Sequence, residues 1–435
     1  MTTDAKRHVE TTMSTGQPSA GTPGAGQATG TGRQRVVTLV LAAVGFAVNF
    51  WAWALLSPLA PRFKDVLHLG AFQQALLVAV PVVVGSVGRI PVGALTDRFG
   101  GRVMFPLVSL TTIVPVLYLG LSGHSSFAGL LVGGFFLGIG GTAFAIGVPV
   151  VNAWFPPQRR GLAIGLFGVG MGGTAISALT TVKLVTAHGI ATPFIVTAIV
   201  LAAYAALTAL LLRDAPGRIL PTEPLAQRLA ATARLRITWQ AAALYAVLFG
   251  GYVAFSVYLP AYLKAAYGLA PADAANRMAG FVLLAVVMRP IGGWLSDRLG
   301  PTRVLASALA VVVVGAATAA FTPNLAPLGT IAFLAMAAAL GTGSGATFAL
   351  VALLAPQNKV GSVTGIVGAA GGLGGFVPPL IMGALYEQYD SYAFGLAALA
   401  FVALAALALT VTAVAKSVGR PADRGTTVNG SAAHV

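Results

Sequence analysis

The sequence of 435 residues contains no cysteine, and only 9% of its residues are charged. Without thiols the chain forms no disulfide and offers no thiolate for catalysis. Soluble domains carry charge on about a quarter of their residues, so a chain with so little charge cannot cover itself with a polar surface. The composition therefore excludes a water-soluble globular protein and indicates an integral membrane protein.

Acidic residues are the scarcest charged residues: the chain has 11 Asp and Glu against 26 Lys and Arg, a net charge of +15. An isoelectric point near 10.7 would suggest a nucleic-acid partner in a soluble protein, but here the basic residues lie mainly in short segments beside apolar runs. We interpret them as topology signals and expect no nucleic-acid partner. The first thirty residues contain no apolar h-region, so no cleavable signal peptide is expected.

Apolar residues are what the chain has in abundance, with 57% of the total and a mean hydropathy of +0.86. Many runs reach about 20 residues, the length with which a helix crosses a hydrocarbon core of roughly 30 Å. We predict an all-α membrane protein with twelve transmembrane helices in the lipid bilayer. The expected spans are residues 36–60, 72–96, 103–121, 127–154, 161–184, 190–212, 239–262, 278–297, 303–321, 327–354, 361–385 and 392–414.

These spans fall into two sets of six, separated by a polar segment. The predicted organisation is a disordered cytoplasmic tail (1–34), a six-helix bundle (35–212), a cytoplasmic connector (213–237), a second six-helix bundle (238–415) and a cytoplasmic tail (416–435). By this scheme nineteen Lys and Arg lie on the side of the tails and connector, and five lie on the opposite side. The positive-inside rule then places both termini in the cytoplasm of a multi-pass inner (plasma) membrane protein.

The two halves repeat each other at an offset of 200 residues. A gapless match of this kind indicates a parallel duplication of a six-helix unit, and such repeats place a substrate near the midplane between two halves that rock around it. The matching pairs are Arg89/Arg289, Gly93/Gly293, Asp97/Asp297, Arg98/Arg298, Gly100/Gly300, Pro156/Pro356, Gly161/Gly361, Gly165/Gly365 and Gly168/Gly368.

Arg89 and Arg289 lie inside apolar spans. Asp97 marks the expected end of its helix, and Arg89 precedes it by eight residues. At the helical rise per residue, Arg89 lies roughly 12 Å deeper in the membrane than Asp97. A charge at such depth costs about 2.5–3.5 kcal/mol on insertion scales, so it normally faces a cavity or a partner. Packing of the arginines against backbone carbonyls is the alternative, but equivalent positions in both halves favour a shared functional role.

The acidic residues offer these arginines no partner within the membrane. All eleven Asp and Glu, and all five His, fall in tails, loops or helix ends of the predicted scheme. The natural partner is therefore a small anion, and the planar, bidentate guanidinium suits a planar oxyanion. Proton-coupled transporters commonly use a membrane Asp, Glu or His as relay, so exchange of one anion for another is favoured over proton symport.

Glycines form stripes in the fifth and eleventh expected spans, at positions that include Gly161, Gly165, Gly168 and Gly172. Three- and four-residue spacings put them on one helix face, where small residues let helix backbones approach closely. The stripe predicts tight helix packing or, beside the arginines, a narrow site floored by backbone groups.

The loop with Gly93, Asp97, Arg98 and Gly100, repeated in the second half, resembles the signature loop of the major facilitator superfamily. Its carboxylates sit at helix ends, where they can pair with Arg or cap a neighbouring helix. A solvated loop charge is the alternative. We expect a conformational latch between the two halves, formed by Gly93, Asp97, Arg98, Asp297 and Arg298.

Longer motifs resemble the nitrate/nitrite porter family within that superfamily. They cover both halves of the chain and are more specific than the loop. The matching stretches are residues 46–53, 144–149, 152–157, 161–168, 249–256 and 363–372, together with Tyr245.

The resemblance implies a substrate site. Arg89 and Arg289 would clamp the anion, Phe144 and Phe348 would stack above and below its plane, and Tyr245 would donate a hydrogen bond. The family's fifth helix usually reads Gly-x-Gly-Asn, with the amide on the substrate, whereas this chain has Gly168, Gly170 and then Met171. Either Met171 marks a relaxed or altered substrate, or a group such as Thr142, Thr174 or Asn49 compensates.

The expected function is secondary transport of a small inorganic anion, most simply nitrate/nitrite exchange or uptake by rocker-switch alternating access. A small carboxylate or other organic anion on the same fold is the alternative that Met171 raises, and a non-transporting membrane receptor is a third. The sequence shows no metal-ligand cluster, nucleophile motif or phosphate loop. We therefore expect no enzyme activity, no cofactor and no metal, and a monomer.

Overall fold

The computed structural model describes residues 32–216, 223–269, 271–389 and 391–419, and within these ranges the chain is helical without a β-strand. The first half contains α1 (Gly32–Trp53), α2 (Leu56–Val66), α3 (Ala71–Phe99), α4 (Gly101–Leu121), η1 (Gly123–Ser125), α5 (Phe127–Leu137), η2 (Gly138–Thr142), α6 (Ala143–Trp154), η3 (Pro157–Arg159), α7 (Arg160–Gly168), η4 (Val169–Gly172), α8 (Gly173–His188) and α9 (Ala191–Leu211). The rest contains α10 (Leu225–Ala233), α11 (Arg236–Tyr267), α12 (Pro271–Leu299), α13 (Pro301–Ala320), η5 (Leu325–Gly329), α14 (Thr330–Leu354), η6 (Gln357–Lys359), α15 (Val360–Tyr389), α16 (Ala393–Leu409), η7 (Thr410–Val414) and α17 (Ala415–Gly419).

Twelve stretches of the described chain are long and apolar enough to cross a membrane, which confirms the predicted number of spans. Several spans combine two or three elements, such as residues 127–154, where α5, η2 and α6 follow one another. Their limits differ from the expected ones by a few residues because polar residues such as Arg236 continue a helix beyond the apolar run.

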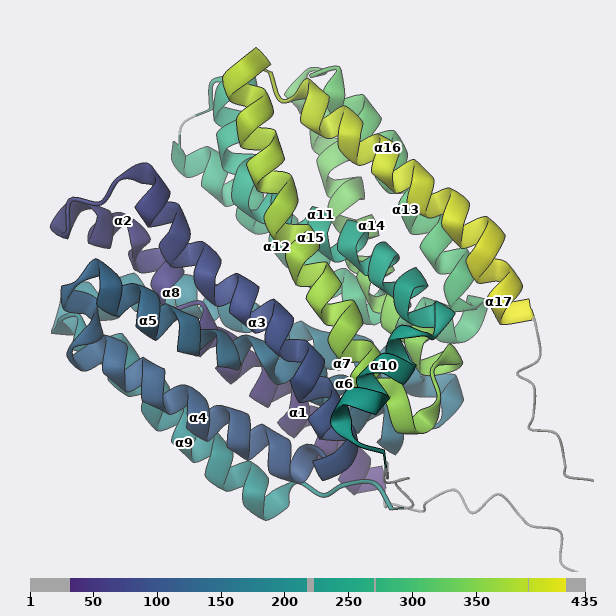
Figure 1. Cartoon of the computed structure of the whole chain (residues 1–435). Coiled ribbons are helices and arrows are strands. Elements are labelled where there is room, and N and C mark those ends of the chain that lie inside the picture. The colour runs from purple at the N-terminus through teal and green to yellow at the C-terminus, as the bar shows by residue number, and fades with distance from the viewer. Residues whose placement is uncertain (1–31, 217–222, 270, 390, 420–435) are drawn as a thin grey trace, which may run out of the picture.

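The helices form two groups that follow the order of the chain (Figure 1). In Figure 1 the first group, coloured from purple to teal, contains α1–α5, α8 and α9, and the second, coloured from teal through green to yellow, contains α11–α17. The groups meet near α6, α7 and α10 and diverge toward α2 and the far ends of α12 and α15. We call the face with α10 and the loops at Gly100 and Gly300 the connector side, and the other face the open side.

Glycines bring the two groups together at two equivalent places. A Cβ on Gly93 of α3 would collide with the backbone of Gly361 at the start of α15, and a Cβ on Gly293 of α12 would collide with the backbone of Gly161 in α7. Because only glycine lets the backbones approach so closely, these contacts explain why the glycine pattern recurs in both halves. The loops beside them also need glycine, since φ is 80° at Gly100 and 85° at Gly300.

The halves differ in the regularity of their inner helices. In the first half, 3₁₀ turns interrupt two spans, η2 between α5 and α6 and η4 between α7 and α8, whereas α14 and α15 run without such a break in the second half. The interrupted stretches read GIGGT and VGMG, and glycine weakens a regular α-helix. A 3₁₀ turn has a different backbone hydrogen-bond pattern from an α-helix. The carbonyl of Gly141, in η2, accepts a hydrogen bond from Arg89.

The segment between the two bundles, predicted as a polar connector, contains the helix α10 over residues Leu225–Ala233. The local sequence does not predict this helix, because nine residues are too few for a stable isolated helix. Packing against the bundles stabilises it. The predicted tails lie mostly outside the described residues. Residues 32–34 begin α1, and residues 416–419 continue the last span as α17.

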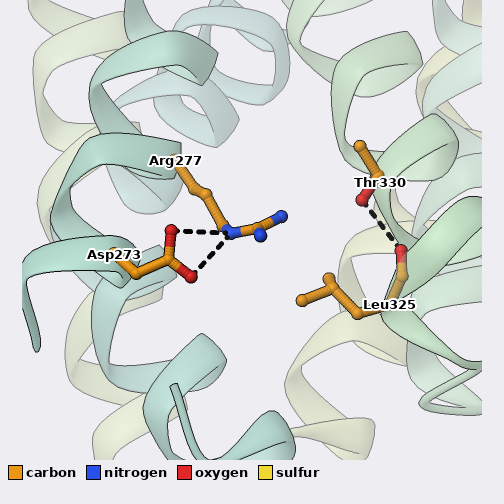
Figure 2. Close-up of polar contacts among 4 residues, drawn as sticks. All are labelled: Asp273, Arg277, Leu325 and Thr330. Atoms are coloured by element: carbon orange, nitrogen blue, oxygen red, sulfur yellow. Dashed lines mark hydrogen bonds and ion pairs between the residues drawn. The ribbon is translucent and has the colours of Figure 1, made fainter. Parts of the chain in front are cut away.

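Local polar contacts fix helix ends at the open side of the second half (Figure 2). Arg277 contacts both carboxylate oxygens of Asp273 one turn earlier on α12, at 3.2 and 3.3 Å. The hydroxyl of Thr330 donates to the carbonyl of Leu325 at 2.8 Å, where η5 passes into α14. Both side chains of the ion pair are over 40% exposed, and exposed pairs contribute little to stability.

Candidate functional site

A cavity of about 240 Å³ lies between the two halves and reaches from the open side to Arg89. On α3 its lining runs from Val78 to Arg89 and stops short of the helix end at Phe99, so the connector side stays closed below it. Arg89 is the one charged residue among the lining residues. They are Phe50, Trp53, Ala54, Leu56, Ser57, Pro58, Val78, Pro81, Val82, Ser86, Arg89, Met171, Thr174, Ala178, Phe249, Tyr252, Val253, Ser256 and Gly372.

Arg89 connects the two halves at the bottom of this cavity. Its Nε donates to the carbonyl of Gly141 in η2 at 3.0 Å, and its Nη1 donates to the carbonyl of Gly368 in α15 at 2.8 Å. The side chain is 2% exposed. Two backbone carbonyls orient the guanidinium without neutralising it, so its full positive charge remains at the closed end of the cavity.

Arg289 on α12 also contacts both halves, through different groups. Its Nη1 donates to the sulfur of Met171 in η4, and its Nη2 lies 3.2 Å from the hydroxyl of Tyr245 on α11. The side chain is 4% exposed, and Nε has no partner among the described residues. A thioether is only a weak acceptor, so Arg289 is the less satisfied of the two arginines.

Phe144 on α6 brings the two charges to one place. The guanidinium carbons of Arg89 and Arg289 lie 5.5 and 6.0 Å from the centroid of its ring. Phe50 and Phe249 supply further rings at 5.8 Å from Arg89 and Arg289, respectively. Such contacts stabilise a cation by about 0.5–2 kcal/mol, but they leave the net charge of +2 at this site in place.

The aromatic rings around the arginines contact one another directly in this structure. Phe144 and Phe348 meet edge to face, with centroids 4.9 Å apart and an interplanar angle of 72°. The ring parallel to Phe144 is that of Tyr245, at 5° and 6.2 Å, and Phe348 also meets Tyr245 edge to face. In this conformation the rings of Phe144 and Phe348 are in direct edge-to-face contact, so a planar anion stacked between them requires a rearrangement of the rings.

The electrostatic environment of the two arginines lacks a counter-charge among the described residues. Ion pairs such as Arg277–Asp273 and Lys359–Glu223 lie at helix ends and in loops, away from the two arginines. No group of three or more His, Asp or Glu that could hold a metal ion occurs in the described part of the chain. Removing a charge from water is costly unless it is paired, so an anion entering the cavity finds two buried positive charges that it can neutralise.

The residues of the altered fifth-helix motif have separate positions. Met171 lines the cavity and contacts Arg289, and a Cβ on Gly168 would lie 3.0 Å from Nε of Arg289. Gly170 faces away from the arginines, since a Cβ there would meet Ala43 and Phe46 of α1. The structure therefore brings Met171 and Gly168 to the arginine site and uses Gly170 for packing.

The proposed substitutes for the missing amide lie in different places. Asn49 is fully buried within the first half, where its amide donates to the carbonyl of Gly45 and to the hydroxyl of Ser109, both at 2.9 Å. Thr142 donates to the carbonyl of Ile139 at 2.6 Å. Of these three only Thr174 lines the cavity, and its hydroxyl donates to the carbonyl of Met171 at 3.0 Å.

The predicted latch residues Asp97 and Asp297 cap helices of the opposite half on the connector side. Asp97 accepts hydrogen bonds from the N–H groups of Gly361 and Ser362 and from the hydroxyl of Ser362, at 2.7–2.8 Å. Asp297 accepts from the N–H groups of Gly161 and Leu162, both at 2.8 Å. A carboxylate at a helix N-terminus satisfies its free N–H groups and opposes the positive end of the helix dipole.

The other latch candidates have different contacts. Gly93 touches α15 through its backbone, as described above. The guanidinium carbon of Arg98 lies 5.5 Å from the ring centroid of Phe99, and that of Arg298 lies 4.3 Å from the ring of Trp294. Both arginines are exposed, so they extend over aromatic rings of their own helices.

Four groups at the site had no assigned role in the sequence analysis: the rings of Phe50 and Phe249 and the carbonyls of Gly141 and Gly368. Phenylalanine commonly packs between membrane helices, and the spacing of Phe50 and Phe249 in the sequence does not distinguish a ring that faces a charge from one that only packs. The signal for Gly141 was the glycine-rich stretch 138–141, which marks an interrupted helix with accessible carbonyls.

Comparison with known proteins agrees with this architecture. The sequence model of the Major Facilitator Superfamily matches residues 42–275 and 241–430. Among solved structures, FucP in its outward conformation has a TM-score of 0.69 at 19% identity, covering 87% of this chain and 99% of that one. The human organic anion transporter MFSD10 has a TM-score of 0.70 at 15% identity, covering 88% and 100%. At these identities the structures support the fold alone.

Closer sequence relatives are bacterial. The "Probable nitrate/nitrite transporter NarK2" of Mycobacterium tuberculosis H37Rv is 46% identical over 90% of this chain and 100% of its own length. The "Nitrite extrusion protein" of Bacillus subtilis is 35% identical over 86% of this chain and 93% of its own length. The chain belongs to the Major Facilitator Superfamily and, within it, to the family of the nitrate/nitrite porters.

Proposed function

We propose that this protein transports nitrate and nitrite across the plasma membrane by alternating access, with Arg89 and Arg289 binding the anion. Its family consists of transporters rather than enzymes, and its twelve spans make it a multi-pass membrane protein. The observation that carries the proposal is the pair of buried guanidiniums on either side of one contact ring, Phe144, with Arg89 lining the cavity and neither arginine in an ion pair with a carboxylate among the described residues. The relatives named for nitrate and nitrite support this choice of anion.

The arrangement of the two halves supports an outward-facing state. With both termini in the cytoplasm, the connector side is cytoplasmic, the cavity opens outward, and the caps by Asp97 and Asp297 close the cytoplasmic side. Rocking of the halves would break these caps and expose the arginines to the other side. An anion between two repelling charges lowers the free energy of bringing the halves together, so substrate binding and conformational change are coupled.

Exchange of one anion for another is the proposed mode, because the Asp and His residues of the twelve described spans, Asp97, Asp297 and His188, lie at span ends, and the two aspartates cap helices of the opposite half. A proton relay would need such a group deep in the membrane. Nitrite leaving on one side would replace nitrate entering from the other. We propose that the monomer is the functional unit and that lipid surrounds its twelve helices.

A counterflow assay in proteoliposomes tests the substrate. Vesicles loaded with unlabelled nitrate or nitrite should accumulate labelled nitrate, and a proton ionophore should leave the rate unchanged if exchange operates. Absence of counterflow from protein that is folded and reconstituted would rule out the proposal.

A small carboxylate is a second candidate substrate, favoured by one observation. Met171, in place of an amide, contacts Arg289 and lines the cavity. A thioether offers no donor to a nitrate oxygen and adapts to an irregular apolar ligand. Formate, oxalate and lactate should therefore be included in the same assay, and stronger counterflow with one of them than with nitrate would assign the carboxylate.

A further inference from the structure

The connector helix α10 lies across the junction of the two halves and contacts both α3 and α15 (Figure 1). Its Arg228 is 1% exposed and is among the largest fully buried side chains of the described chain. One nitrogen, Nη2, donates to the carbonyl of Ala94 on α3, whereas Nε and Nη1 have no partner among the described residues. A connector that merely joined two bundles would not require a buried charge.

Burial of a guanidinium with unpartnered nitrogens is costly unless an opposite charge lies near it. The nearby carboxylate on α3 is Asp97, which follows Ala94 by three residues and so lies on the same face of the helix. The carboxylate of Asp97 accepts three hydrogen bonds from Gly361 and Ser362 of α15. Arg228 therefore holds α10 against α3 one helical turn from the carboxylate that joins α3 to α15.

The residues directly before α10 also contact the second half. Glu223 lies 3.9 Å from Nζ of Lys359, in the turn η6 that directly precedes α15. Because the Glu223 side chain is 50% exposed, this ion pair contributes little by itself. Together with Arg228 it shows that the connector contacts α3 and the start of α15 at the same junction.

The two caps of the latch therefore differ although the repeat makes their residues equivalent. Asp97 accepts three hydrogen bonds, is 8% exposed and lies beside α10. Asp297 accepts two hydrogen bonds and is only partly buried. The connector follows the first half and precedes the second, so its contact with one cap has no equivalent in the repeat.

We propose that Arg228 is a positioning residue of the transport cycle, which fastens α10 to α3 beside Asp97 and thereby stabilises the state closed on the connector side. The proposal rests on the alternating access proposed above. It implies that the Asp97 cap is more stable than the Asp297 cap. Loss of Arg228 favours the opposite state, in which the connector side opens and the outer cavity closes.

The full-length chain is well suited to a spin-label test because it contains no cysteine. One pair of cysteines replaces Gln158 and Asn358, equivalent positions of the two halves on the connector side; a second pair replaces Ser57 and Ser256, which line the cavity. Electron–electron distance measurements in nanodiscs, without substrate, report the two sides separately. These distances do not depend on which anion is transported, so they remain informative if the proposed substrate is wrong.

In Arg228→Gln we expect the 158–358 distance distribution to lengthen and the 57–256 distribution to shorten in a substantial fraction of molecules. The matched control is Arg234→Gln, which removes an exposed arginine at the end of the same helix and should keep the wild-type distributions. Distributions in Arg228→Gln identical to those of the control would overturn the proposal.

Arg228→Lys separates positioning from folding. Lysine retains the positive charge and can donate to the carbonyl of Ala94, so Arg228→Lys should show distance distributions close to those of the wild type. If Arg228 only filled space, Arg228→Met would show the same distributions as Arg228→Lys. If Arg228→Gln fails to yield monodisperse protein, the comparison of Arg228→Lys with Arg228→Met decides. Equal distributions in those two variants would also overturn the proposal.

Discussion

At the scale of single residues, the two arginines of the site differ in their ligands. Arg89 is held by two backbone carbonyls, and these are present whatever the side chains around them. Arg289 is held by a thioether and a phenol, groups that the anion can displace at little cost. We infer that Arg289 reorients on substrate binding, whereas Arg89 forms the fixed end of the site.

Replacement of either arginine by lysine should impair transport, because lysine lacks the bidentate fork. A hydrogen bond to a charged group contributes about 1.5–3 kcal/mol, so each variant should lose roughly 10- to 100-fold in apparent nitrate affinity. Counterflow rates against nitrate concentration measure the change. Exposed Arg234→Lys is the control, and an unchanged affinity in both Arg89→Lys and Arg289→Lys would contradict the assigned site.

Met171 should limit the size of the transported anion, since its side chain lies between the cavity and Arg289. Shortening it in Met171→Ala leaves space beside a guanidinium, so competition by lactate against labelled nitrate should increase several-fold. Met171→Leu keeps the volume without the sulfur and should retain the wild-type selectivity for size. Equal competition profiles for alanine and wild type would show that other residues define the site.

At the scale of helices, the closed state depends on two glycine contacts, α3 with α15 and α12 with α7. Helix ends are capped across these contacts by carboxylates of the opposite half. Because opening of the connector side would break both the backbone contact and the cap, we expect the latch to behave as a two-state element whose equilibrium a single residue can shift.

Gly93→Ala should destabilise the state closed on the connector side, because the added Cβ would collide with the backbone of Gly361. We expect transport to fall by at least tenfold, with a longer 158–358 distance in the spin-label experiment. Gly172→Ala is a matched control, since nothing lies within 4 Å of a Cβ at that position. A wild-type transport rate for Gly93→Ala would mean that the contact between Gly93 and Gly361 is not needed for transport.

At the scale of the whole molecule, the distribution of positive charge predicts the orientation of the protein in the membrane. Single cysteines replacing Gln227 on α10 and Ser125 in η1, both exposed, should react with a membrane-impermeant maleimide from opposite sides in whole cells. Ser125→Cys should be labelled without permeabilisation and Gln227→Cys only after it, because the basic connector stays in the cytoplasm. The reverse pattern would invert the proposed outward-facing state.

The sequence by itself determined the features that depend on composition and periodicity. Low charge and long apolar runs required a membrane protein with twelve spans, because the bilayer accepts only segments of that length and polarity. The offset repeat identified Arg89, Arg289, Asp97 and Asp297 as equivalent pairs, since each lies at the same depth in its half.

The tertiary structure decided what those residues contact, because the contacts join segments far apart in the chain. Asp97 meets Ser362 and Arg89 meets Gly368, across more than 260 residues. The edge-to-face arrangement of Phe144 and Phe348 depends on how the halves pack. So does the burial of Arg228, which lies on a helix too short to be stable alone. Local patterns do not specify such packing, so charge placement was predictable from the sequence and its partners were not.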